Sequence, residues 1–479
     1  MKGKDVSDAL NGAPAQYIDG SKPKNRKKKK GWIAAVAAVL AVTLTLGVLY
    51  IRGGKPQNVK PVPGALKAYA VGVPEYPKTA PYPSSDFGND DWYNSVARRV
   101  SFYGAGEGLE PFYFSSAAAV LLSAENAVYS PFSAYLALAM LAELTDGNTR
   151  AQILEALRAE SMEALRTQAN AVWNANYFND GATISVPADS VWLSDSIDYN
   201  KDTLDVLARD YYAASFSGEF GNKNYDTAVQ KWINAQTGDL LKEAAAGVKF
   251  PPETVVGLIS ALCFRAKWAD TFSASDTAPG TFYAEDGTET ADFMHQTVTY
   301  GRYYYGERFG AVSLNFKQGC KMTFILPDEG VSPNAVLRDE EACAFLCAAG
   351  TDSALSEYEK SAFLRINLSV PKFDVSSNVD LKEMLAALGI RDCFDASLSD
   401  FSPLTGSGQP VVLTEAKQSA RVAVDEEGVT AAVFTELVGA GAAMPPEDEM
   451  DFTLDRPFLF LISGFDGAPL FIGTVFHVQ

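Results

Sequence analysis

The sequence predicts an α+β protein with one large domain. Apolar residues make up 47% of its 479 residues, enough for a substantial core, and charged residues make up 21%. From about residue 90 onward, helical patterns come first along the chain and strand patterns come later. Elements grouped in this way favour an α+β architecture.

Two helices are expected near the start of this domain. The first covers residues 130–143, because Ser130 can cap a helix and Pro131 is favoured at the first helical position. Thr149 followed by Gln152 has the spacing of a capping box and predicts the start of the second helix.

The second half of the domain contains strand patterns and one short helix. Apolar and polar residues alternate over residues 364–370, which is typical of a half-buried strand. Residues 380–388 are expected to form a helix that ends at Gly389. Two apolar runs, 457–462 and 469–476, are separated by a glycine-containing turn and predict a hairpin-like pair of strands.

The N-terminus differs in charge from the rest of the chain. Residues 1–31 hold nine Lys or Arg and three Asp, a net charge of +6, whereas the remaining residues carry 31 basic and 56 acidic side chains, a net charge of −25. The run 31–51 has no charged residue and would span about 31 Å as a helix, which matches one bilayer core. We therefore expect a basic cytoplasmic tail at 1–31 and a transmembrane helix at 32–51, with Ile33–Ile51 in contact with the membrane.

This topology predicts where the domain lies. Because the cluster Lys22–Lys30 precedes the apolar run, the N-terminus is expected inside the cell and the rest outside. Residues 52–95 are rich in Pro, Gly and Tyr and are expected to form an extended linker that holds the domain, 96–479, away from the membrane. The chain resembles a single-pass bacterial surface protein, although a eukaryotic secretory-pathway protein also fits. A cleaved signal peptide, which would release the domain as a secreted protein, is the alternative.

Composition argues against nucleic acid and against a bound metal or cofactor. An acidic domain repels the phosphate backbone of nucleic acids, so no nucleic-acid partner is expected. The five cysteines are odd in number and loosely spaced, unlike a disulfide framework. Cys343 and Cys347 have the spacing to share a helix face and hold a metal, but no CxxC motif or nearby histidine supports them. Buried free thiols and no metal site are therefore predicted.

No catalytic residue is predicted, because the usual enzyme motifs are missing. The only histidines are His295 and His477, and any Ser-His-Asp site would have to be built on one of them. The sequence contains no G-x-S-x-G, no HExxH, no Walker loop and no GxGxxG. A membrane-attached enzyme is therefore the least favoured functional hypothesis.

Two neighbouring motifs near the C-terminus carry a family resemblance. Residues 426–432 have the sequence EEGVTAA, an acidic pair followed by glycine and small residues, and residues 452–458 have the sequence FTLDRPF. Further segments follow the family order: NAVYSPFS at 126–133, FRAKW at 264–268, MTFILP at 322–327, VPKF at 370–373, LGI at 388–390, DFS at 400–402 and FIGTV at 471–475. Together, over about 350 residues, these segments resemble the serpin family of serine protease inhibitors.

The resemblance implies the serpin fold, in which helices pack around a large central mixed sheet, with smaller sheets beside it and an exposed reactive loop, here roughly Glu426–Pro446. It also implies an activity. A serine protease attacks one bond of the loop and forms a covalent acyl-enzyme, and the freed loop inserts as a new strand of the central sheet before hydrolysis is complete. The protease is distorted and trapped, so the inhibition is irreversible. A monomer without a cofactor is expected.

The hinge of this loop suits a segment that inserts as a strand. By resemblance the hinge consists of Glu426, Glu427, Gly428, Val429, Thr430, Ala431 and Ala432. Side chains alternate along a strand, and those that would face the core are small or β-branched: Val429, Ala431, Val433 and Thr435. No proline occurs between Glu427 and Met444, so every residue there can donate to a ladder. Gly428 leaves the hinge free to bend.

Two observations place the attacked bond between Ala442 and Ala443. Counting along the loop from the first hinge acid, Glu426, as in family members, ends at Ala442. The segment Met444-Pro445-Pro446 resembles the x-P-P that follows the bond in the family. Ala443–Met444 is the second candidate. Alanine fills only a small primary pocket, so elastase-like or subtilisin-like proteases are the expected targets.

The resemblance also assigns residues around the point at which the sheet opens: Asn126, Ser130, Ser133, Ser260, Trp268 and Gln418. The family usually pairs an Asn with a His there, and the matching positions here are Ser260 and Gln418. Both partners differ from the pattern, so a substituted polar contact is expected.

Two interpretations of the resemblance stay open. An inhibitory member traps the protease after cleavage of the loop, whereas a non-inhibitory member serves as a binding protein whose loop is merely cleaved. The inward alternation of small residues in the hinge favours the inhibitory interpretation.

Overall fold

The structure is a computed structural model, and it describes residues 60–83, 89–406, 411–414, 416–429, 446 and 448–478. The predicted transmembrane helix at 32–51, the hinge residues Thr430, Ala431 and Ala432, and the bond Ala442–Ala443 lie outside the described residues. None of the helices among the described residues has the length and apolar character needed to cross a bilayer.

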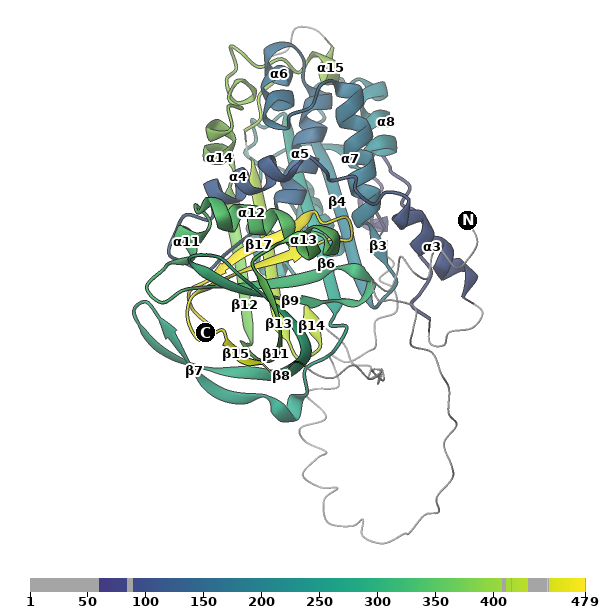
Figure 1. Cartoon of the computed structure of the whole chain (residues 1–479). Coiled ribbons are helices and arrows are strands. Elements are labelled where there is room, and N and C mark those ends of the chain that lie inside the picture. The colour runs from purple at the N-terminus through teal and green to yellow at the C-terminus, as the bar shows by residue number, and fades with distance from the viewer. Residues whose placement is uncertain are drawn as a thin grey trace, which may run out of the picture.

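The central sheet has the strand order β1-β5-β4-β6-β14-β13-β12, and β3 adds to β4 (Figure 1). Its strands are β1 (Ala70–Gly72), β3 (Phe178–Asn179), β4 (Thr183–Ser194), β5 (Ala214–Gly218), β6 (Val256–Lys267), β12 (Phe373–Asp380), β13 (Lys417–Asp425) and β14 (Gly428–Val429). Neighbouring strands are antiparallel except β4 and β5, which are parallel. The central sheet is therefore mixed, as expected.

The second sheet has the order β15-β11-β8-β9-β10-β16-β17-β2, and β7 adds to β8. Its strands are β2 (Ala127–Tyr129), β7 (Ala278–Ala284), β8 (Gly287–Tyr305), β9 (Phe309–Asn315), β10 (Lys321–Pro327), β11 (Ser361–Pro371), β15 (Glu449–Thr453), β16 (Phe458–Ser463) and β17 (Pro469–Val475). The strand predicted at 364–370 is confirmed as part of β11, and the predicted C-terminal pair is confirmed as the antiparallel strands β16 and β17.

Helices gather around the central sheet, and Figure 1 shows α5, α6, α7, α8 and α15 at the end of the molecule opposite β7, β8, β11 and β15. The helices are α3 (Asp90–Val100), α4 (Glu110–Val120), α5 (Pro131–Leu144), α6 (Gly147–Ala156), α7 (Met162–Asn176), α8 (Lys201–Asp210), α9 (Lys223–Thr237), α10 (Lys242–Ala246), α11 (Pro333–Val336), α12 (Glu340–Ala348), α13 (Asp352–Glu357), α14 (Lys382–Ala387) and α15 (Ser402–Thr405). The helix predicted at 380–388 is the shorter α14, because Asp380 still pairs with Lys417 in the central sheet.

The predicted helix at 130–143 is confirmed as α5, and it lies in the centre of the core. The Ser130 hydroxyl accepts the backbone N–H of Ser133 at 3.2 Å and caps the helix, and Pro131 occupies its first turn. Almost every residue of α5 is buried, because the helix packs against β6 of the central sheet and β17 of the second sheet. The cap therefore marks where α5 begins, and burial between the two sheets holds the helix in the core.

The capping box predicted at Thr149 is wrong. Helix α6 starts earlier, at Gly147, so Thr149 lies inside it. The Thr149 hydroxyl accepts the backbone N–H of Asp400 at 3.0 Å, and the Gln152 side-chain oxygen accepts that of Asp392 at 3.0 Å. Both side chains connect α6 to a segment far along the chain, a role that short-range spacing does not predict.

The N-terminal segment differs from the predicted spacer at 52–95. Residues 60–83 pack on the domain: β1 pairs with β5 at the edge of the central sheet, Leu66 is buried, and the Trp232 indole donates to the carbonyl of Pro61 at 3.0 Å. Helix α3 also begins before residue 96, where the domain was expected to start. Apolar residues among the prolines explain the difference, because they bury against α9.

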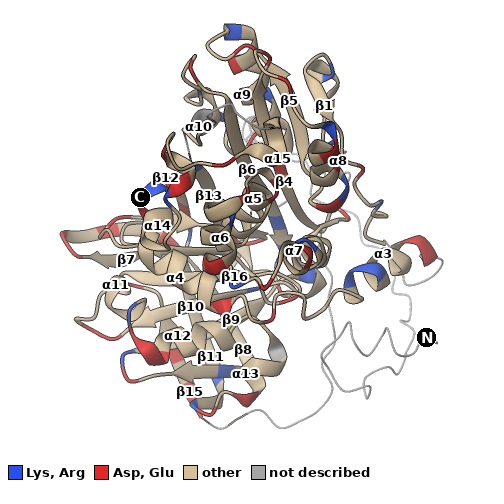
Figure 2. Ribbon diagram, turned by 90° about the horizontal axis from the view of Figure 1, so that it is seen from above, with Lys and Arg blue, Asp and Glu red and all other residues tan. Residues whose placement is uncertain are grey.

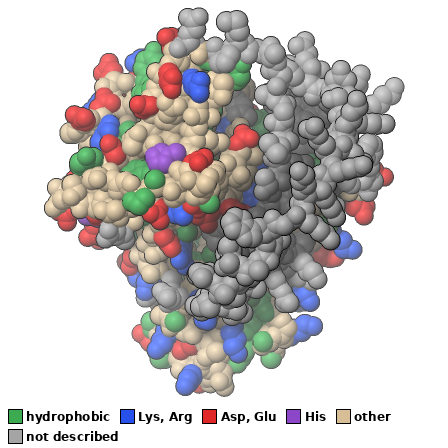
Figure 3. Space-filling view, turned by 90° about the horizontal axis from the view of Figure 1, so that it is seen from below, with side chains coloured by type: hydrophobic (Ala, Val, Ile, Leu, Met, Phe, Trp, Pro, Cys, Tyr) green, Lys and Arg blue, Asp and Glu red, His purple; other side chains and the backbone are tan. Residues whose placement is uncertain are grey.

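Charged residues lie mainly on the periphery of the fold, on loops and helix ends (Figure 2). On the described part of the face drawn in Figure 3, acidic and basic side chains are interspersed and do not form a single patch of one sign.

Candidate functional site

Of the predicted hinge residues, the structure describes Glu426 to Val429. The last two of these form a short strand in the middle of the central sheet. Gly428 and Val429, which make up β14, lie between β6 and β13. Val429 is opposite Ala266 on β6 and Val424 on β13, and both pairings are antiparallel. Its side chain is buried in the main core, on the side that the alternation of the hinge assigned to it. The hinge thus enters the sheet at one end of a space between two strands.

A tight turn connects β13 to β14. One Asp425 carboxylate oxygen accepts the backbone N–H groups of Glu427 at 3.0 Å and Gly428 at 3.2 Å, which fixes the turn. Gly428 has φ +150°, and a Cβ there would overlap the carbonyl oxygen of Ala266. Only glycine allows the two strands to approach this closely.

The two hinge acids are held by different partners. The Glu426 carboxylate pairs with Lys372 at 2.6 Å and accepts the hydroxyl of Thr277 at 2.9 Å. Partial burial works against its ionisation, but these hydrogen bonds outweigh burial and hold the pKa of Glu426 below its usual value. Burial raises the pKa of Glu427, which the charge of Lys267 opposes. The hinge turn is therefore anchored chiefly through Glu426.

Trp268 also holds this turn, through two hydrogen bonds. Its indole N–H donates to the carbonyl of Asp425 at 3.0 Å, and its backbone N–H donates to the carbonyl of Glu427 at 3.0 Å. The fully buried ring stacks on Phe316 with centroids 4.4 Å apart. Trp268 therefore contacts the turn through which the hinge enters the sheet.

Beyond β14 the sheet is incomplete. Among the residues that the structure describes, no ladder joins β6 to β13, and a single bridge connects Val256 at the start of β6 with Leu413, which precedes β13. A cavity of about 340 Å³ lies on the face toward α10, and one of about 40 Å³ lies on the face toward α5. Leu258, Ser260 and Lys417 line both cavities. This stretch without a ladder, with a cavity on each face, is called the gap between β6 and β13 below.

A polar cluster under this gap ties both strands to the start of α5. The Gln418 amide bonds both backbone groups of Ser130: its oxygen accepts the N–H at 2.7 Å and its nitrogen donates to the carbonyl at 3.0 Å. The Ser130 hydroxyl bonds that of Ser133 at 2.9 Å, and the Ser260 hydroxyl donates to the Ser133 carbonyl at 3.3 Å. Gln418 and Ser260 therefore each bond the start of α5, through Ser130 and Ser133 respectively.

Asn126 does not belong to this cluster. Its side-chain amide donates to the carbonyl of His477 at 2.7 Å, and its oxygen accepts the backbone N–H groups of Phe476 at 2.6 Å and His477 at 2.9 Å. The resemblance assigned it to the sheet opening together with the serines of the motif NAVYSPFS. In the structure it holds the C-terminal segment against β2.

Asp189 is a member of the cluster that sequence reasoning missed. It lies on β4 directly opposite Ser260 on β6, and it is buried. Burial raises the pKa of its carboxyl to about 7, although a hydrogen bond with Ser260 opposes the shift. A single Asp inside a strand pattern gave no signal of this environment.

The cysteines are free thiols. Cys263, Cys320 and Cys393 are buried as predicted, but Cys343 is half-buried and Cys347 is exposed on α12. Although the residue is exposed, partial desolvation of its sulfur raises the pKa of Cys347 to about 11, so its thiolate is disfavoured near neutral pH.

Comparison with known proteins decides the family. The sequence profile described as "Serpin (serine protease inhibitor)" matches residues 112–478. This chain is a serpin. Human "Leukocyte elastase inhibitor" is 27% identical over 361 residues, covering 73% of this chain and 92% of that relative. Human "Neuroserpin" is 28% identical over 375 residues, covering 74% of this chain and 87% of that relative.

Prokaryotic and structural relatives agree with this assignment. A serpin-like protein of Thermococcus kodakarensis is 25% identical, covering 74% of this chain and 80% of that relative. The native structure of the thermophilic serpin tengpin superposes with a TM-score of 0.68 at 24% identity and covers 84% of this chain and 97% of tengpin. The expected serpin fold is confirmed. The packed N-terminal segment and α3 precede the range matched by the family profile.

Proposed function

We propose that this serpin is an irreversible inhibitor of serine proteases, and that its cleaved loop inserts between β6 and β13 in the register that β14 sets. The observation that supports the proposal is the gap itself. A strand of suitable hinge residues already enters it at one end, and cavities lie on both faces beyond that point.

The β14 pairings predict the register of insertion. Val429 lies opposite Ala266 and Val424, and each later loop residue would lie opposite one earlier residue on each strand. Thr435 then comes opposite Ser260 and Gln418. Residues 430–439 would cover the ten residues of β6 that β14 leaves open, from Arg265 to Val256.

The side chains in this register match their surroundings. Ala431 would lie between Phe264 and Val422, both buried in the core, where only a small residue fits. The Thr435 hydroxyl would meet the polar cluster of Ser260 and Gln418. These matches favour insertion over a loop that is cleaved without consequence.

The reaction begins when the protease serine oxygen attacks the carbonyl carbon of Ala442. The Ala442–Ala443 peptide bond breaks, an ester to Ala442 forms, and the amine of Ala443 leaves with the serine proton. Elastase-like or subtilisin-like enzymes are the proposed targets, because alanine fits small primary pockets. The similarity to a relative named leukocyte elastase inhibitor supports the first of these.

The location belongs to the same proposal. The uncharged run 32–51 behind a basic tail supports a single-pass membrane protein whose serpin domain lies outside the cell. Fractionation of the source cells followed by N-terminal sequencing tests it. Recovery from membranes with residues 1–31 intact supports an anchor, whereas a soluble chain that begins after residue 51 supports a cleaved signal peptide.

The test of inhibition mixes the purified full-length chain with pancreatic elastase and with subtilisin. We expect a covalent complex that survives denaturing electrophoresis and a fragment that begins at Ala443 by intact mass. A matched pair of variants identifies insertion as the cause. Ala431→Glu places a charge toward the core and should be cleaved without trapping, whereas Ala432→Glu points toward exposed Arg421 and should still trap.

Two results would count against the proposal. Cleavage without a covalent complex, for both enzymes, would favour the non-inhibitory interpretation. Equal trapping by both variants would show that the β14 register does not continue into the gap.

A further inference from the structure

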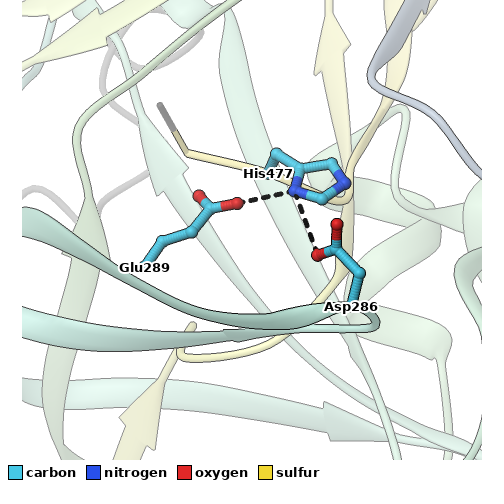
Figure 4. A group of neighbouring side chains, drawn as sticks. All are labelled: Asp286, Glu289 and His477. Atoms are coloured by element: carbon cyan, nitrogen blue, oxygen red, sulfur yellow. Dashed lines mark hydrogen bonds and ion pairs between the residues drawn. The ribbon is translucent and has the colours of Figure 1, made fainter.

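Three side chains that could bind a metal meet where the C-terminus crosses a hairpin. Asp286 lies in the turn between β7 and β8, Glu289 lies on β8, and His477 follows β17. Figure 4 shows the two carboxylates directed toward the same edge of the imidazole ring. One ligand atom from each residue lies within 4.8 Å of the others. Three donors from two distant parts of the chain thus converge.

The distances suit a small divalent cation. His477 Nδ1 is 2.6 Å from Glu289 Oε1 and 3.9 Å from Asp286 Oδ1. Nitrogen and oxygen ligands of a tetrahedral Zn²⁺ lie about 3.3 Å apart when the metal–ligand bonds have their usual length of about 2.0–2.2 Å. The two distances lie on either side of that value. Small movements of exposed Asp286 and of the Glu289 side chain would admit the ion.

The histidine is already held in place. Its backbone N–H and carbonyl both bond the side chain of Asn126, at 2.9 Å and 2.7 Å. The second Glu289 oxygen accepts the backbone N–H of Val478 at 2.8 Å, which leaves Oε1 directed at the ring. Such supporting contacts orient metal ligands and reduce the entropy lost on binding.

We propose that Asp286, Glu289 and His477 bind one Zn²⁺ ion. Two carboxylates and one imidazole form a donor set that suits Zn²⁺, and a water molecule would complete the tetrahedron because the Asp286 side chain is 81% exposed. The ion would link the β7–β8 hairpin to the C-terminal segment and stabilise the folded chain. This inference does not depend on protease inhibition.

The experiment is calorimetric titration of the full-length chain with ZnCl₂ under reducing conditions, together with thermal unfolding. We expect one Zn²⁺ per chain and a higher Tm with Zn²⁺ than without it. His477→Gln should weaken binding by more than about tenfold, since even the loss of an outer contact to a ligand costs that much. Asp286→Asn should weaken binding as well, and because Asp286 is exposed this variant separates loss of binding from a folding defect.

Matched controls use the other histidine and the exposed thiol. His295 is exposed and bonds Ser369 instead, so His295→Gln should bind Zn²⁺ as the parent does. Cys347→Ser should also keep binding. Absence of binding by the parent chain, or unchanged binding by His477→Gln or Asp286→Asn, would overturn the proposal. The His477–Glu289 contact would then serve only to hold the C-terminus.

Discussion

The two edges of β6 are built in opposite ways. On one edge β4 pairs with it over eleven residues, from Thr183 opposite Ala266 to Leu193 opposite Val256. On the other edge, among the residues that the structure describes, β14 pairs only with Lys267 and Ala266, and cavities follow. Within that part of the chain, one strand therefore combines a complete ladder with a mostly unpaired edge. The proposed inhibition requires this unpaired edge to accept one more strand.

The magnitude of this difference explains how insertion could drive inhibition. A net hydrogen bond contributes about 1 kcal/mol, so a further ten-residue strand that bonds both neighbours would add on the order of 10 kcal/mol. Burial of small side chains such as Ala431 would add to this. The energy is available only if the gap stays open until the loop is cut.

The largest expected effect concerns Asp189, on the closed edge. Its folded pKa of about 7 lies above the ordinary value of 3.8, so the folded state keeps a proton that the unfolded state has lost between these values. Stability from this group is therefore fully present below pH 4 and is lost as the pH rises to 7. We expect a loss of up to about 1.4 kcal/mol per pH unit, and on the order of 4 kcal/mol over the window.

Urea unfolding at several pH values measures this. Asp189→Asn should flatten the pH dependence of the unfolding free energy between pH 4 and 7, whereas exposed Asp198→Asn should leave it as in the parent. An unchanged profile in Asp189→Asn would mean that the buried carboxyl does not control stability in this range.

The next largest effect concerns Gly428, where β14 lies close against β6. Gly428→Ala combines an unfavourable φ with overlap of the Ala266 carbonyl, and we expect it to lower the unfolding free energy by about 3 kcal/mol. Gly287 has a similar φ of +159° but open space around its Cβ position. Gly287→Ala should therefore cost only about 1 kcal/mol in the same denaturant experiment. Equal costs would show that close approach of β14 to β6 is unimportant.

A smaller effect is expected from the hydrogen bonds that join Gln418 on β13 to Ser130. Gln418→Ala removes the acceptor of the buried Ser130 N–H and one of the two donors to the Ser130 carbonyl, which also accepts the N–H of Ala134. It should lower the unfolding free energy by about 2 kcal/mol. Its neighbour Ser419 points to the other face of β13, where it bonds Asn378. Ser419→Ala should change stability by less than about 0.5 kcal/mol. If Gln418→Ala changes the unfolding free energy as little as Ser419→Ala does, the bonds between Gln418 and Ser130 do not stabilise β13.

Short sequence patterns correctly predicted the elements that depend on neighbouring residues in the chain. Ser130 and Pro131 marked the start of α5, and alternation marked β11. The same reasoning failed where distant residues compete. Thr149 and Gln152 bond the segment around Asp400 and do not cap α6.

The candidate site likewise contains residues that motifs identified and residues that only folding brings together. Resemblance identified Gly428, Val429, Ser260 and Gln418, whose positions follow from motifs. It misplaced Asn126, whose partner His477 is about 350 residues away. Asp189 and the Asp286–Glu289–His477 cluster had no signal, because each depends on side chains that only the folded chain brings together.

The most direct test of the open gap is thermal unfolding of the chain before and after a single cut in the loop. A metalloprotease that cleaves within residues 430–446 forms no acyl-enzyme, so the cut chain can be purified and checked by intact mass. We expect a rise in Tm of roughly 12 °C, the value obtained when about 10 kcal/mol is added to a folded domain of about 400 residues. An unchanged or lower Tm after the cut would contradict it, because the freed loop would then have found no place between β6 and β13.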